Sequence, residues 1–410
     1  MSPPRVALFV ETSRAYGRSV LQGVWQYVKE HDRWSILFRP RGLEEPTPAW
    51  MASWSGDGII AHVNNTRTAR LLQKSAARCV DVLGDVEGFG FPFIGTDNAR
   101  IAHMATEHLL YTGLRNFAVC GLRKGQRPRL DDRCEAFEAL IHEAGHPCHV
   151  YRPRGGGRYG PSWTQEQKQI AEWLKTLPRP IGIFACNDVR GRELLDACQT
   201  AGISVPEQAV VLGVGNDDIL CELSEQRLSS IDVNPVRIGY QAADMLCRMM
   251  AGERVEPSIT VPPRRVIERQ STNVLAVDDQ EVAAAIQFIR LHACDAIDVS
   301  EVVHRVGLSR RVLERRFRML LRRSIKAEIV RVRLDRAKEL LAETSLSATT
   351  IAKRCGFSTP AYFMDHFHQR VGVTPIRFRE VNRMNWTSGQ ASKDDDQAYP
   401  TEEHPAYEGS

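Results

Sequence analysis

The chain has 410 residues, which is too long for one ordinary domain and indicates two or three. Its ten cysteines form no Cys-x-x-Cys pair, and no apolar run approaches the roughly 18 residues of a membrane span, so neither a disulfide framework nor a membrane partner is expected. The net charge of +4 is concentrated in one basic block, residues 298–382 with 18 Lys/Arg against nine Asp/Glu, which is the footprint of a module that binds a polyanion.

The predicted elements begin almost at the N-terminus. Val6–Val10 is typical of a strand and is too short for the apolar core of a signal peptide, which favours a cytoplasmic protein. From there to about residue 270, short β-branched runs alternate with helical patterns, the order expected of parallel α/β layers in two subdomains. The expected strands are Val6–Val10, Ser35–Phe38, Gly58–His62, Cys79–Leu83, Phe93–Thr96, Asn116–Cys120, Cys148–Arg152, Ile181–Cys186 and Val210–Val214. The expected helices include Ala15–Lys29, Arg100–Tyr111, Leu130–Glu143, Thr164–Leu177, Val189–Ala201 and Pro235–Met250.

Polar side chains gather after several of these strands, where open parallel sheets bind their ligands. Carboxylate, amide and guanidinium groups at one rim suit a polyhydroxylated ligand, because each can bond a pair of hydroxyls. Any one of them could instead be an ordinary helix cap or loop residue, but clusters at the same kind of position favour a site. The candidate ligand-binding residues are Arg18, Asp97, Asp188, Arg190, Asn216 and Asp217.

The segment His142-Glu143-Ala144-Gly145-His146 matches the His-Glu-x-x-His pattern of zinc proteases. Gly145 and Pro147 end the helix before both histidines can share a face, and no third ligand follows at a suitable spacing. We therefore interpret the segment as a helix C-terminus that enters a strand. With no other catalytic motif in the chain, we expect no enzyme activity, no metal and no cofactor.

The composition changes beyond residue 262. Pro262-Pro263 ends the last α/β element, a polar stretch runs to Asp279, and a purely helical pattern follows. The stretch after Arg383 is polar and acidic, which is typical of disorder. The predicted division is a ligand-binding domain at 1–273, a linker at 274–282, a helical domain at 283–383 and a disordered tail at 384–410.

Two segments of the helical part repeat one pattern. The first is Val302–Ser309, followed by Leu313 and Phe317; the second is Ile351–Ser358, followed by Phe363 and Phe367. Each segment has a short amphipathic helix that ends at a Gly, where left-handed backbone costs little, and a Ser follows that can cap the next helix. The i,i+4 apolar pair then holds the second helix on the first. This spacing predicts two helix-turn-helix units.

The first recognition helix, expected at Ser309–Met319, is rich in arginine. Arginine can bond guanine O6 and N7 together, Glu can accept from cytosine N4, and the remaining cations can contact phosphates. A solvated charged face is the alternative, but the turn pattern and the local charge favour DNA. The candidate residues are Arg310, Arg311, Glu314, Arg315 and Arg318.

Residues 285–382 resemble the DNA-binding domain of AraC-type transcription regulators. The residues that carry the resemblance are Leu334, Ala337, Leu340, Leu341, Ile351, Ala352, Cys355, Gly356, Phe357, Phe363, Phe367, Gly372, Thr374, Pro375 and Arg379. The resemblance implies two recognition helices in successive major-groove segments of a double-stranded operator, with RNA polymerase as a further partner. At the base-reading positions of the second helix the chain has Thr359, Pro360, Ala361, Met364 and Asp365, of which the last four are poor donors to bases.

The first half resembles LacI-type and periplasmic sugar-binding domains. Local matches are Ala15–Arg18, Thr96–Asn98, Asp188–Arg190, Gly239–Ala243 and Val266–Thr272. The combined resemblance implies a periplasmic-binding-protein-like α/β half and a homodimer that regulates carbohydrate catabolism genes under control of a small sugar, a pentose such as xylose. LacI-type domains usually carry a sugar-binding Asp where this chain has Gly215, so another polyol or a hexose stays open. A plain sugar-binding protein for transport is the rival interpretation, and whether the ligand activates or represses also stays open.

Overall fold

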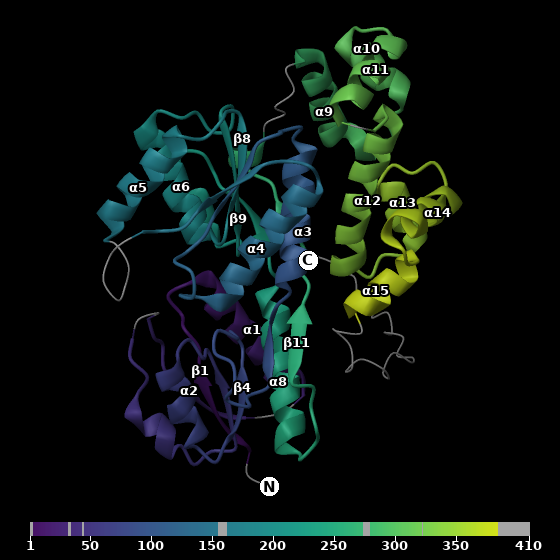
Figure 1. Ribbon diagram of the computed structural model, residues 1–410. Coiled ribbons are helices and arrows are strands. Elements are labelled where there is room, and N and C mark those ends of the chain that lie inside the picture. Colours follow the sequence, from purple (N-terminus) through teal and green to yellow (C-terminus); the bar gives the residue numbers. More distant parts are fainter. Residues whose placement is uncertain are drawn as a thin grey trace, which may run out of the picture.

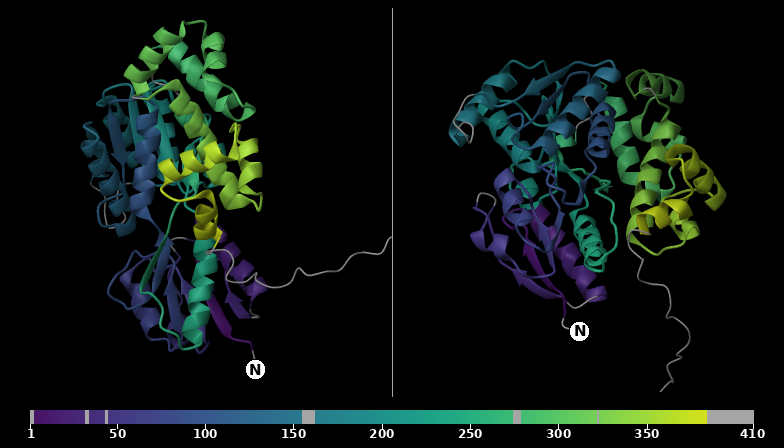
Figure 2. Two further views of the ribbon diagram at one scale, coloured as in Figure 1. Left: turned by 90° about the vertical axis from the view of Figure 1, so that its right-hand side faces the viewer. Right: turned by 60° about the horizontal axis from the view of Figure 1, so that its bottom comes forward.

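Two α/β subdomains and a helical module make up the chain (Figure 1). The computed structural model describes residues 3–31, 34–42, 45–154, 162–273, 279–321 and 323–383. The predicted acidic tail and residues 274–278 of the predicted linker lie outside this range. The helical module lies beside the α/β half and in Figure 1 reaches past its upper end; Figure 2 shows the two halves from two further sides.

The first subdomain is a six-stranded sheet in the order β11-β5-β4-β3-β1-β2, and all its neighbours are parallel. Successive side chains of a strand face opposite sides of the sheet. Val6 and Leu8 pack on α1 and α8, while Ala7 and Phe9 pack on α2 and the short 3-10 helix at Ala49–Ser53. The elements are β1 (Arg5–Phe9), α1 (Ala15–Glu30), β2 (Ser35–Phe38), β3 (Gly58–Ala61), α2 (Thr66–Gln73), β4 (Arg78–Asp81), β5 (Phe93–Thr96), α8 (Pro235–Met250) and β11 (Ser258–Val261).

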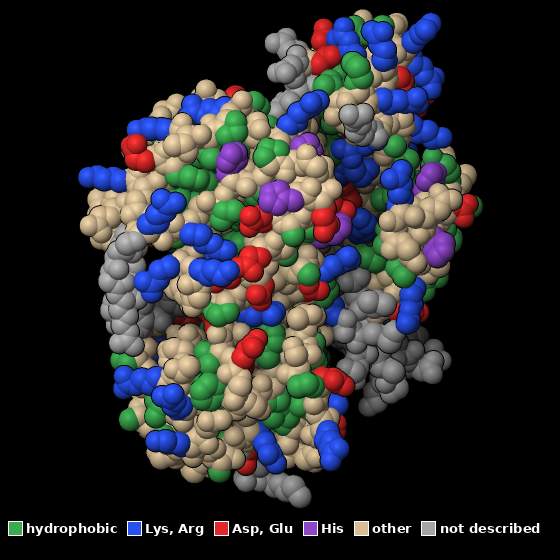
Figure 3. Space-filling model, viewed as in Figure 1, with side chains coloured by type: hydrophobic (Ala, Val, Ile, Leu, Met, Phe, Trp, Pro, Cys, Tyr) green, Lys and Arg blue, Asp and Glu red, His purple; other side chains and the backbone are tan. Residues whose placement is uncertain are grey.

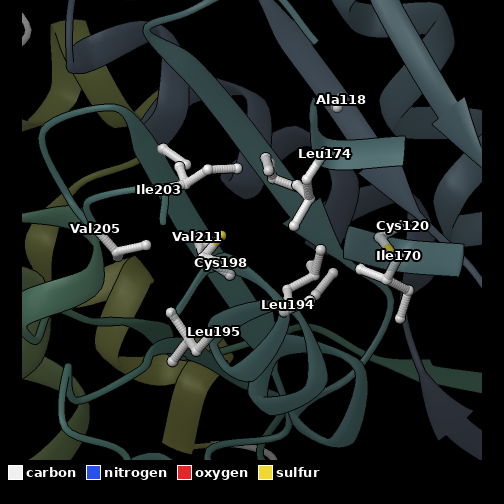
Figure 4. Close-up of a cluster of buried hydrophobic side chains, with 14 of the residues drawn as sticks. Ala118, Cys120, Ile170, Leu174, Leu194, Leu195, Cys198, Ile203, Val205 and Val211 are labelled. Atoms are coloured by element: carbon white, nitrogen blue, oxygen red, sulfur yellow. The ribbon is translucent and has the colours of Figure 1, made fainter. Parts of the chain in front are cut away.

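The second subdomain is a sheet in the order β12-β10-β9-β8-β6-β7, parallel except for β12, which runs antiparallel to β10. Helices α5 and α6 cover one face with the buried cluster of Figure 4, and α3 and α4 cover the other. The elements are α3 (Asn98–Tyr111), β6 (Phe117–Cys120), α4 (Pro128–Glu143), β7 (Cys148–Tyr151), α5 (Trp163–Lys175), β8 (Ile181–Ala185), α6 (Asp188–Ala201), β9 (Ala209–Val214), α7 (Asp218–Glu222), β10 (Ser229–Asp232) and β12 (Arg265–Ile267).

This architecture confirms the predicted parallel α/β half with two subdomains. Three short strands, β10, β11 and β12, escaped the prediction, and Pro262-Pro263 lies between the last two of them instead of ending the α/β part. The chain passes from one sheet to the other after β5, after β10 and after β11, so three connecting segments of the described chain join the subdomains. Helix α4 ends at Glu143, and Gly145 is left-handed, so the segment with the zinc-protease pattern leads into β7 as predicted.

Helices α1 and α8 approach each other at the backbone. A Cβ atom on Gly239 would lie 1.8 Å from the carbonyl oxygen of Val20, and one on Gly23 would lie 1.8 Å from that of Val236. Only glycine fits at these two points, because any side chain would overlap the backbone of the partner helix. The two glycines therefore set the spacing of the helix pair that covers the first sheet.

The helical module contains both predicted helix-turn-helix units. A capping box between Asp298 and Glu301 starts α10, and left-handed Gly307 ends it; Gly356 is the corresponding left-handed residue of the second unit. The four aromatic or aliphatic residues of the predicted i,i+4 pairs are fully buried. The helices are α9 (Gln280–His292), α10 (Val299–Val306), α11 (Arg310–Leu321), α12 (Ile325–Glu343), α13 (Ala348–Arg354), α14 (Pro360–Val371) and α15 (Pro375–Arg383). Helix α9 thus begins inside the predicted linker. None of the described helices has the length and apolar character needed to cross a membrane.

Candidate functional site

The outward face of α11 carries the predicted base-reading side chains. Arg311, Arg315 and Arg318 are exposed, and together with Glu314 and Met319 they line an open hollow of about 490 Å³. Figure 3 shows Lys and Arg side chains gathered over the part of the surface formed by α10 and α11. Guanidinium groups on one exposed helix face are suited to base edges and phosphates of a major groove.

Arg316, which the sequence did not place in the interface, has a different role. Its Nη1 atom lies 3.0 Å from Asp279 Oδ2 and 3.5 Å from Glu281 Oε2, at the start of α9. These ion pairs attach α11 to the first helix of the module. Arg310, the first residue of α11, is exposed, and Glu314 forms a long i,i+4 pair of 3.6 Å with Arg318. A pair of this length is weak, so it leaves the exposed Arg318 free to contact DNA, whereas the Glu314 side chain is only 21% exposed.

The second recognition helix, α14, presents a less polar surface. The Thr359 hydroxyl accepts a hydrogen bond from Tyr362 N at 3.1 Å and so caps the helix, with Pro360 in its first turn. Ala361, Met364 and Asp365 are exposed on the outward face. The structure thus turns the predicted positions to the solvent, but it gives them little capacity to donate hydrogen bonds to bases.

In the α/β half, the carboxyl ends of the strands of the two sheets face each other. Asp217, after β9, accepts a hydrogen bond from Ala15 N at the start of α1, at 3.0 Å. Asp85, after β4, forms an ion pair with Arg127, the residue before α4. Both contacts join the two subdomains, so polar side chains from both of them meet at the place predicted for the ligand.

Asp188 and Asp217 are two predicted ligand residues that the fold brings into direct contact. Asp188 is buried, and it accepts hydrogen bonds from Ser230 Oγ at 2.5 Å and from Asp217 N at 2.8 Å. Burial raises the pKa of Asp188 to about 6, although these two bonds oppose the shift. A Cβ atom on Gly215 would lie 2.9 Å from Asp188 Oδ2, so the Asp188 carboxylate fills the space that a side chain at 215 would need.

Arg190 lies deeper than the sequence suggests. It is 3% exposed, and its guanidinium lies 2.7 Å from Glu166 Oε1 and 2.8 Å from Glu193 Oε2. Two carboxylates therefore already neutralise it on the side of α5 and α6. A ligand hydroxyl would have to share this cation with them.

Of the other three predicted ligand residues, Asn216 lies beside this pair, because its N–H donates to Ser230 Oγ at 3.0 Å, whereas Arg18 and Asp97 make contacts elsewhere. Arg18 is exposed on α1 and donates to Thr12 O at 2.9 Å. Asp97 caps α3 by accepting from Arg100 N at 2.9 Å. Asn216 has a left-handed backbone with φ 50°, and its buried Oδ1 has no hydrogen-bond partner within the described residues. Of the three, only Asn216 offers a buried acceptor that a ligand could use.

His62, which follows β3 at the facing rim, was not among the predicted ligand residues. It is 6% exposed, its Nδ1 accepts from Glu11 N at 3.3 Å, and its ring stacks on Tyr16 at a centroid distance of 5.8 Å. Its Nε2 is buried without a partner among the described residues, so an N–H donor is available beside the cleft. Burial lowers the pKa of His62 to about 3, with further lowering from the Arg127 and Arg41 guanidiniums. The position after a strand was the available signal, but the residue was assigned to the strand itself.

A neutral buried His62 predicts a specific pH dependence of stability. Its folded pKa lies below the value of the unfolded chain, so its contribution is complete above about pH 6.5 and is lost as the pH falls. Between pH 7 and pH 5, the unfolding free energy of the parent should therefore fall by about 2 kcal/mol relative to that of His62→Gln. Urea unfolding of both proteins at the two pH values measures this difference. A difference that does not change with pH would show that His62 binds a proton as readily in the folded protein as in the unfolded chain, which contradicts its burial as a neutral group.

A two-subdomain sensor of this fold, joined to two helix-turn-helix units with a cationic recognition helix, defines a class of protein: DNA-binding transcription regulators with an appended ligand-binding domain. The comparisons agree. Residues 106–272 match the periplasmic binding protein-like domain, residues 302–380 match a helix-turn-helix domain, and residues 5–99 match the XylR N-terminal domain.

The xylose operon regulatory protein of Haemophilus influenzae is 33% identical over 382 residues, which cover 92% of this chain and 98% of that protein. The protein of the same name from Escherichia coli K12 is 34% identical over 389 residues, covering 92% and 97%. The solved structure of a "xylose-binding transcription activator xylR" superposes with a TM-score of 0.60 at 33% identity, covering 93% of this chain and 99% of that one. The chain belongs to the family of xylose operon regulatory proteins. It is a DNA-binding transcription regulator and not an enzyme.

Proposed function

We propose that this regulator binds a small sugar, a pentose such as xylose, between its two α/β subdomains, and that the sugar controls activation of carbohydrate catabolism genes. Residues 1–273 would form the sensor and residues 283–383 the part that binds a double-stranded operator. The observation that carries the proposal is the rim of partly satisfied polar groups, with Asn216 Oδ1 and His62 Nε2 both buried and unpartnered within the described residues. The hydroxyls of a sugar can both donate and accept, so a sugar can supply a donor for Asn216 Oδ1 and an acceptor for His62 Nε2.

The relatives support the choice of xylose and of activation. One relative is named a xylose-binding transcription activator, and two more are named for the xylose operon. The same class supports a cytoplasmic location and a contact with RNA polymerase. The second candidate is a regulator of the same architecture that senses another polyol or a hexose. It is favoured by Gly215, because this position lacks the sugar-binding side chain that LacI-type domains usually carry.

Calorimetry of the full chain against xylose, ribose, arabinose and glucose tests the ligand. Xylose is expected to bind, and Asn216→Gly should weaken it about tenfold, because the removed acceptor leaves a hydroxyl unmet while Gly keeps the left-handed backbone. Asn116→Ala, at the opposite end of the second sheet, is the control and should bind as the parent does. Tight binding of glucose alone would leave the proposed binding site in place but show that the ligand is a hexose and not xylose. Binding of none of the four sugars would refute the proposal.

The proposed homodimer has a candidate surface on β2, the edge strand of the first sheet. Ile36, Leu37 and Phe38 are 40%, 42% and 43% exposed, and an exposed apolar edge strand is a template for pairing with another chain. We propose that two copies meet through this edge. Sedimentation equilibrium should then give twice the chain mass of 46.2 kDa, whereas a monomeric mass would exclude the pairing.

A further inference from the structure

One aromatic residue of the sensor half lies in the core of the DNA-binding half. Tyr111, the last residue of α3, is 6% exposed and belongs to a buried cluster whose other members all come from Val282 onward. Among them are Ile286 of α9 and Ile325 of α12. Figure 1 shows α3 standing beside these helices. The contact is thus between the sensor and the helix that connects the two helix-turn-helix units.

Three arginines of the DNA-binding half surround the Tyr111 ring. The Cζ atoms of Arg290, Arg323 and Arg331 lie 5.0, 4.4 and 4.0 Å from its centroid. Each lies within the range in which the negative face of an aromatic ring attracts a cation, and the attraction grows as water is removed. We call these three arginines, together with Glu328, the Tyr111 socket.

Glu328 completes the socket. Its side chain is fully buried, it accepts a hydrogen bond from the Tyr111 hydroxyl, and its oxygens lie 3.1 Å from both Arg323 and Arg331. A buried carboxylate is tolerated only when charges and donors satisfy it, so Tyr111 supplies both a ring for the cations and a donor for the anion. The socket is therefore built for a tyrosine from the other half of the chain.

A second contact lies one helical turn earlier. His108 Nδ1 is 3.7 Å from Glu268 Oε1, and Glu268 Oε2 is 3.8 Å from Arg290 Nη1. Burial lowers the pKa of His108 to about 4, which Glu268 opposes and Arg290 and Arg331 reinforce, so the histidine is neutral at pH 7. Glu268 of the sensor thus forms its ion pair with the arginine of α9, and His108 adds a polar contact.

The other end of α3 lies at the facing rim of the sheets. Asn98 Oδ1 accepts from Arg133 Nε at 3.0 Å and Nη2 at 2.8 Å, and its Nδ2 donates to Arg129 O at 2.7 Å. Both arginines come from α4, and Arg129 also donates to Thr96 O at the end of β5. One helix, about 20 Å long, therefore links the connection between the subdomains to the socket.

We propose that α3 couples the sensor cleft to the DNA-binding module, and that the Tyr111 socket holds the module in the orientation that α3 sets. The proposal rests on the proposed sugar control for its regulatory part. A ligand can change DNA affinity only through a difference between two arrangements of the protein. Movement of the subdomains displaces the start of α3, and the socket transfers that displacement to α12, which carries both helix-turn-helix units.

The test uses the full chain with Tyr111→Ala, and Glu107→Ala on the solvent side of α3 as the matched control. Small-angle X-ray scattering should show a longer maximum dimension for Tyr111→Ala than for the parent, because the module is released. In fluorescence anisotropy, the sugar should change the DNA affinity of Tyr111→Ala by less than about twofold, whereas the factor for coupled sites is typically about 5- to 150-fold. Calorimetry should show xylose bound within about twofold of the parent's affinity, as expected for a change outside the cleft. Glu107→Ala should match the parent in all three measurements.

Tyr111→Phe keeps the ring and removes only the hydroxyl, so it guards against a folding defect in the alanine variant. It should retain the parent's scattering profile and lose part of the sugar effect, because Glu328 then loses the donor that comes from the sensor and keeps only the arginines of its own half. The proposal is wrong if Tyr111→Ala keeps both the scattering profile and the sugar effect of the parent. If the parent itself shows no sugar effect, the proposed function fails, and the scattering measurement alone tests the socket. An unchanged scattering profile of Tyr111→Ala would then overturn the role of the socket, and a longer maximum dimension would support it.

Discussion

Gly239→Ala is expected to destabilise the α/β half by about 3 kcal/mol, through overpacking at the crossing of α1 and α8. The added methyl would lie 1.8 Å from the carbonyl oxygen of Val20, and backbone cannot move aside as a side-chain tip can. The helices must separate, and the cluster that contains Val24 and Leu246 opens with them. Urea unfolding followed by tryptophan fluorescence measures the loss.

Gly42→Ala is the control for this prediction. Gly42 has negative φ, and no atom lies within 4 Å of its Cβ position, so its substitution should change stability by less than about 0.5 kcal/mol. Equal stability of the two variants would show that α1 and α8 do not pack as closely as described. The Gly239 variant should leave the helical module folded, since that module has its own buried clusters.

The double variant Arg311→Ala/Arg315→Ala is expected to lose most specific DNA binding. Each guanidinium that grips a base is worth about 1–3 kcal/mol, so the pair should weaken the specific site by roughly 30-fold or more. Both side chains are exposed on the outward face of α11, so their removal should leave the fold intact. Fluorescence anisotropy with DNA selected from a random library, at fixed salt, gives the affinities.

Met364→Ala provides the comparison on the second recognition helix. Met364 is 41% exposed on α14 and cannot donate a hydrogen bond, so its loss should cost clearly less than the loss of either arginine. Selection should also return a more tightly specified sequence under α11 than under α14. A more tightly specified sequence under α14 than under α11 would contradict the assignment of base reading to α11.

The helix-turn-helix units were predictable because their signal is local. Gly307 and Gly356 end the first helices, and the apolar pairs four residues apart, such as Leu313 and Phe317, fix the buried face. The strands that escaped prediction are short and carry polar residues, as Ser229 and Ser230 of β10 do. Their strand conformation comes from pairing with distant neighbours, which no local pattern records.

For the proposed ligand site, the sequence predicted which strand ends meet but not the contacts that their side chains make. Because parallel strands end at one rim, Asp188 and Asp217 were expected to lie close together, and Asp217 N donates to Asp188 in the structure. The partners of Arg190, however, depend on how α5 packs on α6, and Glu166 gives no sign of that in the sequence. The sequence also gave no reason for a glycine at position 215. In the structure, the Asp188 carboxylate occupies the space that a side chain at this position would need.

The socket was beyond sequence reasoning altogether. Tyr111 is the last residue of an amphipathic helix, and its hydroxyl meets Glu328, 217 positions away along the chain. A contact between two domains leaves no periodicity in either of them. Packing alone determines which residue of the helix end is buried.

The most direct test of the account is the affinity of the full chain for its selected DNA with and without saturating xylose. The account predicts that xylose changes this affinity by about fivefold or more, and that Asn216→Gly shifts the response to about tenfold higher sugar concentration. Salt must be held constant, because the cationic face of α11 makes DNA binding salt-dependent. An unchanged DNA affinity at saturating sugar, with xylose binding shown by calorimetry, would contradict coupling between the two halves of the chain.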